Sequence, residues 1–353
     1  MSARTVWPPI AFPGTDMLLW PDDRPAPVLP AGKAGIAVRI RSKAGDPAPY
    51  PKLFTVGVDD RPLWWGLGRM IAVVEPGEHL VEVRGMRAAD TARQVRVAAG
   101  EIAELEFWTP RASATSKVRG ILVPAPARRR PGTGRYLVLG YLVAFTLLIL
   151  TSIANLRPDG RGFAALVAVP IAVALLAIWW KRRGDARYRV AASVEAAEAG
   201  RDGPGGWFLG DGEPPARLAD DGHGVLVVTG ALTRDYTWNG RRFINHMPAT
   251  NVNAWMPWPD LTIDGEPRPF SWHSWCYRLT PGPHEITVAV RAPESAADRF
   301  AGDRATHRVT VTAGQVTRLD VGVTGRVEVR SASLDPEAPS EITGFSATVS
   351  CTT

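Results

Sequence analysis

The chain has 353 residues, with 41 lysines and arginines against 35 aspartates and glutamates, and therefore a formal net charge of +6. This length is sufficient for more than one folded domain. The only two cysteines, Cys276 and Cys351, exclude a disulfide framework and are expected to be free thiols, as is usual in a reducing compartment.

The positive charge is concentrated in the middle of the chain. Residues 1–125 carry a net charge of +3, residues 126–189 carry +9 and residues 190–353 carry −6. A nucleic-acid-binding domain needs a basic surface of its own, whereas the long C-terminal region is acidic. The charge distribution therefore predicts that nucleic acid is not a partner.

The first region, residues 1–125, has the pattern of a small β-domain. Residues 1–34 are rich in proline, lack the continuous apolar run of a signal peptide, and are interpreted as linker or edge-covering loops. Beyond them, stretches that alternate apolar and polar residues are separated by turn residues, which is typical of a β-sandwich. Strands are expected at residues 36–40, 55–60, 80–84, 94–97 and 102–107.

The middle region, residues 126–189, contains two long segments without a charged residue, 136–155 and 163–180. A hydrocarbon core about 30 Å thick requires roughly 20 apolar residues in a helix, so these segments are predicted to form a transmembrane α-helical hairpin. Basic residues flank the pair on both sides, namely Arg128, Arg129, Arg130, Arg135, Lys181, Arg182 and Arg183. The positive-inside rule then predicts a two-span cell-membrane protein with both termini in the cytoplasm. The basic flanks are expected to bind anionic lipid headgroups.

The third region, residues 190–353, repeats the order of features of the first. Asp59 precedes Pro76 by 17 residues, and Asp264 precedes Pro281 by the same interval. Strands are expected at residues 225–228, 261–265, 285–290, 308–311 and 316–321. The chain is therefore predicted to be mainly β, with two related β-sandwich domains flanking the transmembrane hairpin.

Short motifs in the two regions resemble PEGA-type domains, which are small β-sandwich modules. The motifs read VDD, EPGEHLVEV and VRVAAG in the first region, and IDG, TPGPHEITV and VTVTAG in the third. The resemblance covers cores of about 35–108 and 224–323, and both cores depart from the family pattern in a tryptophan-rich middle. It implies a β-sandwich fold and a non-catalytic accessory role, and it names no ligand.

Residues 234–259 form an aromatic and asparagine-rich insertion that has no counterpart in the first region. Tryptophan clusters occur in cores, at protein interfaces and on ligand-binding surfaces, and the pattern leaves all three alternatives open. The candidate interface or ligand surface comprises Trp238, Asn239, Trp255, Trp258, Trp272 and Trp275.

No motif for catalysis is found in the sequence, which lacks a phosphate-binding loop, a nucleophile elbow, an H-E-x-x-H motif and a C-x-x-C motif. His79 and His284 occupy equivalent places in the repeat, where they either form a paired ligand site or, as we favour, cap a strand entry. His273, Cys276 and His246 are too few to complete a structural zinc site. The chain is therefore predicted to be no enzyme and to have no catalytic residue, metal or cofactor.

These observations predict a non-enzymatic integral membrane protein. Its two cytoplasmic β-sandwich domains, with their opposite net charges, are expected to bind each other, a protein partner or a second copy of the chain. The alternative is a membrane-anchored ligand-binding or sensory protein that uses the insertion at residues 234–259.

Overall fold

The computed structural model of the chain describes two β-rich regions and a few helical positions between them. The described residues are 9–21, 23–40, 54–85, 91–108, 121–125, 205–210, 212–244, 255–332 and 339–353, together with helical positions 142, 143, 145, 146, 149, 171, 172, 175, 176, 178–180 and 183. The chain divides into two compact units. One unit comprises Met1–Pro126 with Ala192–Thr353, and the other comprises Ala127–Ala191.

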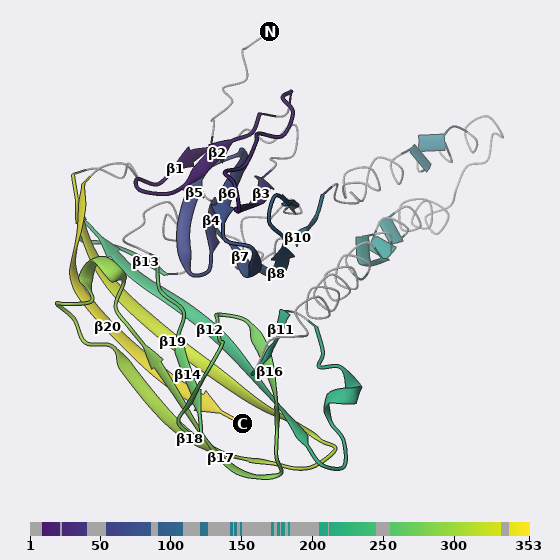
Figure 1. Ribbon diagram of the computed structural model, residues 1–353, viewed down its shortest axis with the longest axis vertical. Coiled ribbons are helices and arrows are strands. Elements are labelled where there is room, and N and C mark those ends of the chain that lie inside the picture. The colour runs from purple at the N-terminus through teal and green to yellow at the C-terminus, as the bar shows by residue number, and fades with distance from the viewer. Residues whose placement is uncertain are drawn as a thin grey trace. The chain divides into compact units, whose positions relative to one another are not determined.

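The N-terminal sandwich consists of two five-stranded sheets (Figure 1). One sheet contains, in spatial order, β1 (Ile10–Ala11), β5 (Arg61–Trp65), β4 (Phe54–Val58), β7 (Gly77–Gly85) and β8 (Thr91–Val97). The other contains β10 (Ile121–Pro124), β9 (Ile102–Trp108), β3 (Ala34–Ile40), β6 (Gly68–Val74) and β2 (Met17–Leu19). Alternate apolar residues, such as Val81 and Val83 of β7 and Ile36 and Val38 of β3, fill the core between the sheets.

The C-terminal sandwich consists of a six-stranded and a four-stranded sheet. The larger sheet contains β11 (Trp207–Gly210), β16 (Ser274–Leu279), β12 (Gly224–Trp238), β19 (Val316–Ser331) and β20 (Ser340–Thr352), with β13 (Arg241–Ile244) paired to β12. The smaller sheet contains β15 (Glu266–Arg268), β14 (Asp260–Ile263), β17 (Gly282–Val290) and β18 (Asp303–Val311). Two short 3₁₀ turns complete it, η2 (Ala216–Leu218) and η4 (Glu294–Ala296). The long strands β12, β19 and β20 lie side by side (Figure 1).

The two sandwiches have the same strand order, apart from β1 and β13, which have no counterpart in the other sandwich. The sheet order β10-β9-β3-β6-β2 of the first corresponds to β20-β19-β12-β16-β11 of the second, and β5-β4-β7-β8 corresponds to β15-β14-β17-β18. In both, one central strand pair is parallel, β3 with β9 and β12 with β19, while the neighbouring pairs are antiparallel. Pairing registers also agree, since Gly57 faces Glu82 and Thr262 faces Thr287. The internal repeat is therefore a repeat of topology and register as well as of sequence.

The structure contains strands at places where the sequence predicts loops. The proline-rich start of the chain forms the edge strands β1 and β2, and the edge strand β11 was also absent from the strands expected in the third region. These strands are two to four residues long, too short to show an alternating pattern. They form because a neighbouring strand supplies their hydrogen-bond partners.

The structure contradicts the predicted membrane hairpin and, with it, the predicted fold class, cell-membrane location and membrane-protein function. Among the described residues, no helix combines the length and the apolar composition needed to cross a bilayer. Most of residues 136–155 and 163–180 lie outside the described residues, and the helical positions described there include the exposed side chains of Leu142, Phe145 and Leu175. A span requires one continuous hydrogen-bonded helix as well as an uncharged segment, and the sequence prediction rested on the segment alone.

Of the seven basic residues predicted to flank the hairpin, one lies within the described residues. Arg183 occupies a described helical position, where its guanidinium lies 5.4 Å from the ring of Trp179. The other six lie outside the described residues, namely Arg128, Arg129, Arg130, Arg135, Lys181 and Arg182.

Candidate functional site

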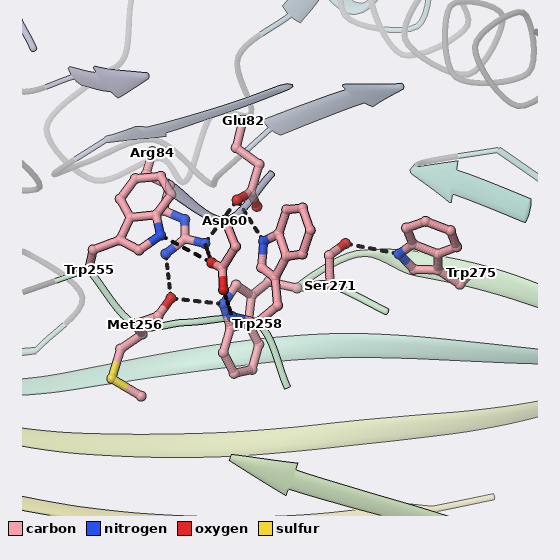
Figure 2. A network of polar contacts seen from close by, with 9 residues as sticks. Asp60, Glu82, Arg84, Trp255, Met256, Trp258, Ser271 and Trp275 are labelled. Atoms are coloured by element: carbon pink, nitrogen blue, oxygen red, sulfur yellow. Dashed lines mark hydrogen bonds and ion pairs between the residues drawn. The ribbon is translucent and has the colours of Figure 1, made fainter. Parts of the chain in front are cut away.

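A cluster of hydrogen-bonded polar groups joins the two sandwiches. The segment that precedes β14 carries two tryptophans to carboxylates of the N-terminal sandwich (Figure 2). The indole N–H of Trp255 donates to Asp60 Oδ1 over 3.1 Å, and the backbone N–H of Trp258 donates to Asp60 Oδ2 over 2.7 Å. The indole N–H of Trp258 donates to Glu82 Oε2 over 2.7 Å. Two carboxylates of one repeat are thus held by two tryptophans of the other that are three residues apart in sequence.

Arg84 of β7 completes this cluster, which we call the docking network. Its Nη1 donates to the carbonyl oxygen of Met256 over 2.7 Å and its Nη2 to Glu82 Oε2 over 2.9 Å, while Asp60 Oδ1 lies 3.6 Å away. The guanidinium also lies 3.5 Å from the centre of the Trp255 ring. Arg84 is 2% exposed and Glu82 is fully buried. Buried charges of this kind are tolerated only when they are paired and hydrogen-bonded.

The turn between β4 and β5 places Asp60 in the docking network. Asp59 and Asp60 have φ angles of 51° and 63°, as a two-residue type I′ hairpin requires. A non-glycine residue in this region is uncommon and costs of order 1 kcal/mol. The hydrogen bonds that Asp60 accepts from Trp255 and Trp258 offset this strain. Gly57 provides the space for the indole, because a Cβ there would lie 2.6 Å from Trp255 Cη2.

Burial raises the pKa of Asp60 to about 6. Arg84 and the N–H donors of Trp258 and Trp255 oppose this effect, whereas the neighbouring Glu82 carboxylate adds to it. The Asp60 carboxyl therefore titrates close to neutral pH while remaining inside the network.

His79, at the entry to β7, holds the turn of the first repeat closed. Its Nδ1 donates to Asp59 Oδ2 over 2.6 Å and its Nε2 donates to the carbonyl oxygen of Glu75 over 2.8 Å. The other oxygen of Asp59 accepts the backbone N–H of Leu80 over 2.9 Å. A carboxylate and a carbonyl are both acceptors, so both ring nitrogens act as donors and the geometry selects the imidazolium. The hydrogen bond to Asp59 is the main cause that raises the pKa of His79.

The second repeat reproduces this arrangement. His284 Nδ1 donates to Asp264 Oδ2 over 2.6 Å, and its Nε2 donates to the carbonyl oxygen of Thr280 over 2.8 Å. Burial acts to lower the pKa of His284, but the bonds to Thr280 and Asp264 outweigh burial and the pKa is raised. Each histidine thus clamps a turn at a strand entry, as the favoured interpretation of the sequence expects.

A cavity of about 770 Å³ adjoins the docking network. Both sandwiches line it, and Asp60 and Trp258 belong to the network and to the cavity wall at once. Other lining residues are His79 and Gln94 from the first repeat, and Arg268, Phe270 and Trp275 from the second.

The structure places most of the predicted aromatic surface in the interior. Trp238, Trp272 and Trp275 belong to the core of the C-terminal sandwich, with exposures of 2% to 6%. The two tryptophans of the docking network, at positions 255 and 258, hydrogen-bond to the first repeat. Asn239 lies in the turn between β12 and β13, where its side chain exchanges two 2.8 Å hydrogen bonds with the backbone of Ser331. Within its described residues, 234–244 and 255–259, the insertion therefore presents no exposed aromatic side chain.

The sequence prediction missed the charged members of the site. Asp60, Glu82 and Arg84 were taken as parts of an ordinary turn and an ordinary strand, and Arg268 was not considered. The segment LVEVR does contain a relevant pattern, because its two charged residues, Glu82 and Arg84, alternate with valines and therefore lie on the opposite face of the strand from them. This pattern indicates an exposed face as readily as a covered one, so the sequence does not distinguish the two.

The candidate metal ligands do not assemble into a site. Among the described residues, no group of three or more His, Cys, Asp or Glu residues could hold a metal ion, and His246 lies outside these residues. Both cysteines are free. Burial raises the pKa of the Cys276 thiol to about 12, which makes this thiol a poor nucleophile and metal ligand.

No protein-family model matches the chain, and no curated protein matches it. The resemblance to PEGA-type modules therefore stays a prediction from the sequence motifs.

Proposed function

We propose that this chain is a non-catalytic binding protein in which the second β-sandwich repeat docks on the first and the two enclose a site for a small organic molecule. The observation that carries this proposal is the cavity of about 770 Å³ with walls from both repeats. Small-molecule sites usually have volumes of about 300 to 1,000 Å³ and are lined by aromatic residues with a few polar groups. Here Trp258, Phe270 and Trp275 supply the aromatic part.

The ionisable groups of the cavity support binding rather than catalysis. Both nitrogens of His79 are engaged, so neither is available as a general base. Both oxygens of Asp60 accept hydrogen bonds from tryptophans of the other repeat. Among the described lining residues, Thr262 supplies the only hydroxyl group, and no serine or cysteine is present. A nucleophile paired with a base, which covalent catalysis requires, is therefore missing from the described wall.

The docking network explains how such a cavity is kept open. The network fixes Trp258 through two hydrogen bonds, one to Asp60 and one to Glu82. Preorganised walls reduce the entropy lost on binding. The non-catalytic role that the PEGA-type resemblance implies agrees with this proposal.

A screen of small aromatic and aliphatic molecules by thermal shift, followed by calorimetry, tests the proposed function. Thr262→Phe places a ring in the cavity and is expected to weaken any hit at least tenfold. Thr348→Phe on β20 is the matched control, because Thr348 is exposed and does not line the cavity. Hits that bind both variants as tightly as the wild-type chain would contradict the proposal.

A further inference from the structure

The charged groups that line the cavity are paired, with one exception. The paired groups are Asp59 with His79 at 2.6 Å, Asp60 with the Trp258 amide at 2.7 Å, Glu78 with Arg96 at 3.2 Å, and Asp260 with Arg291 at 2.9 Å. Arg268 is the exception: within the described part of the chain its guanidinium makes no hydrogen bond and no ion pair, and its Nε is buried without an acceptor. An arginine N–H buried without an acceptor costs free energy.

Local structure holds Arg268 in place. It ends β15 and lies between Pro267 and Pro269, whose rings fix their φ angles. The carbonyl oxygen of Pro269 accepts a 2.6 Å hydrogen bond from the Tyr277 hydroxyl. The guanidinium lies against the backbone of Gly205, where an added Cβ would be 2.8 Å from Nη1. The donor group is therefore positioned before any ligand arrives.

We propose that the cavity binds an organic carboxylate, whose anionic group pairs with Arg268 and whose apolar body packs against Trp258 and Trp275. This inference rests on the proposed function and names its ligand class. The planar guanidinium fork matches a carboxylate through two parallel hydrogen bonds. One unpaired cation suits a monoanion. A phosphate dianion would bring a second negative charge next to four carboxylates without a second free cation.

Calorimetric titration with three probes of the same shape tests the ligand class. The probes are 2-naphthoate, its neutral amide 2-naphthamide, and 2-naphthyl phosphate. We expect the carboxylate to bind at least tenfold more tightly than the amide and more tightly than the phosphate ester. A charge-assisted pair with the half-buried Arg268 corresponds to a difference of about tenfold to a hundredfold.

Two substitutions and a matched control locate the anion. Arg268→Gln is expected to remove the preference for carboxylate over amide, and Arg268→Lys to retain only part of it, because lysine keeps the charge but loses the fork. Arg291→Gln removes a second arginine of the cavity wall that is already paired with Asp260, and we expect less than a threefold change. An unfolding midpoint measured for each variant separates loss of binding from loss of the fold.

The outcomes separate this inference from the proposed function. If the amide binds as tightly as the carboxylate, if the phosphate ester binds more tightly, or if Arg268→Gln leaves the preference intact, the carboxylate assignment is wrong while the cavity still binds small molecules. If none of the probes and no compound of the screen binds, both proposals are wrong.

Discussion

Three equivalent positions in the two sandwiches are occupied by charged residues in the first repeat and by uncharged residues in the second. In the first repeat Asp60, Glu82 and Arg84 form the docking network, and the registers place Gly265, Thr287 and Ala289 at the corresponding positions of the second. The second set is small, uncharged and at least partly exposed. Both repeats nevertheless keep the same turn, the same aspartate–histidine clamp and the same strand pairing.

This difference shows how a repeated fold acquires an interface. The clamp, which both copies keep, maintains the turn, whereas the network occupies the outer face of only one copy. A type I′ turn favours glycine at its second position, and the second repeat has Gly265 there with a φ of 83°. The first repeat has Asp60 at this position, in a less favoured conformation whose cost the interface offsets. Backbone strain at one of the two equivalent turn positions thus identifies the repeat whose outer face forms the interface.

The largest effect is expected from Arg84→Met. This substitution removes the cation that lies closest to both buried carboxylates, Glu82 and Asp60, and we expect the free energy of unfolding to fall by about 3–5 kcal/mol in urea denaturation. Glu82→Gln added to Arg84→Met should recover part of the loss, because it removes one uncompensated charge. The exposed ion pair between Arg291 and Asp260 is the control, and Arg291→Met should lower the free energy of unfolding by less than about 1 kcal/mol. Equal losses for the two arginines would contradict a special role for Arg84.

The second-largest effect is expected from the titration of Asp60, which makes the free energy of unfolding depend on pH. Its pKa is about 6 in the folded chain against 3.8 in the unfolded chain, so between these values the folded state binds more protons. The free energy of unfolding therefore falls as pH rises from about 4 to 6. Asp60→Asn removes this contribution. We expect the stability of the wild-type chain relative to this variant to decrease by up to about 3 kcal/mol between pH 4 and pH 7. If the stability of the wild-type chain relative to Asp60→Asn stayed constant or increased with pH, burial would not be the dominant influence on the pKa of Asp60.

Gly57→Ala tests the contact between Gly57 and the Trp255 ring. The added methyl group would overlap the indole, and overpacking of this kind costs about 1–3 kcal/mol. The equivalent position in the second repeat is Thr262, which already carries a side chain, and Thr262→Ala should change the free energy of unfolding by less than about 1 kcal/mol. Urea denaturation monitored by tryptophan fluorescence measures both. A harmless Gly57→Ala would mean that the indole does not need this space.

The smallest difference is expected between the two histidine clamps. Both pKa values are raised above 6.5, so each clamp stabilises the fold fully below pH 6.5 and loses this contribution as pH rises through the raised pKa. His79→Gln and His284→Gln should each cost about 1 kcal/mol at pH 6 and less at pH 9. NMR titration of the two imidazoles should give pKa values above 6.5 for both. A value below 6.5 for either would contradict the imidazolium assignment.

Sequence reasoning recovered the parts of the fold that depend on local pattern. Alternation at residues 80–84 and 94–97 predicted strands that lie in β7 and β8, and the equal spacing of Asp59 and Asp264 from their prolines predicted a repeat. Edge strands such as β2 were missed, because three residues carry no periodic signal. The membrane hairpin was wrong, because uncharged length was used as evidence for a continuous spanning helix.

The sequence by itself determined the β-sandwich repeat, since the alternation of valines and the position of each aspartate turn act locally, within a few residues. Tertiary structure alone decided which copy became the docking surface. The partners of Asp60 lie 195 and 198 residues further along the chain, and whether the outer face of LVEVR meets water or two indole rings depends on that distant segment. The tertiary structure also decided that the guanidinium of Arg268 is left unpaired. In the sequence, nothing distinguishes this residue from the other lysines and arginines, which number 41 in total.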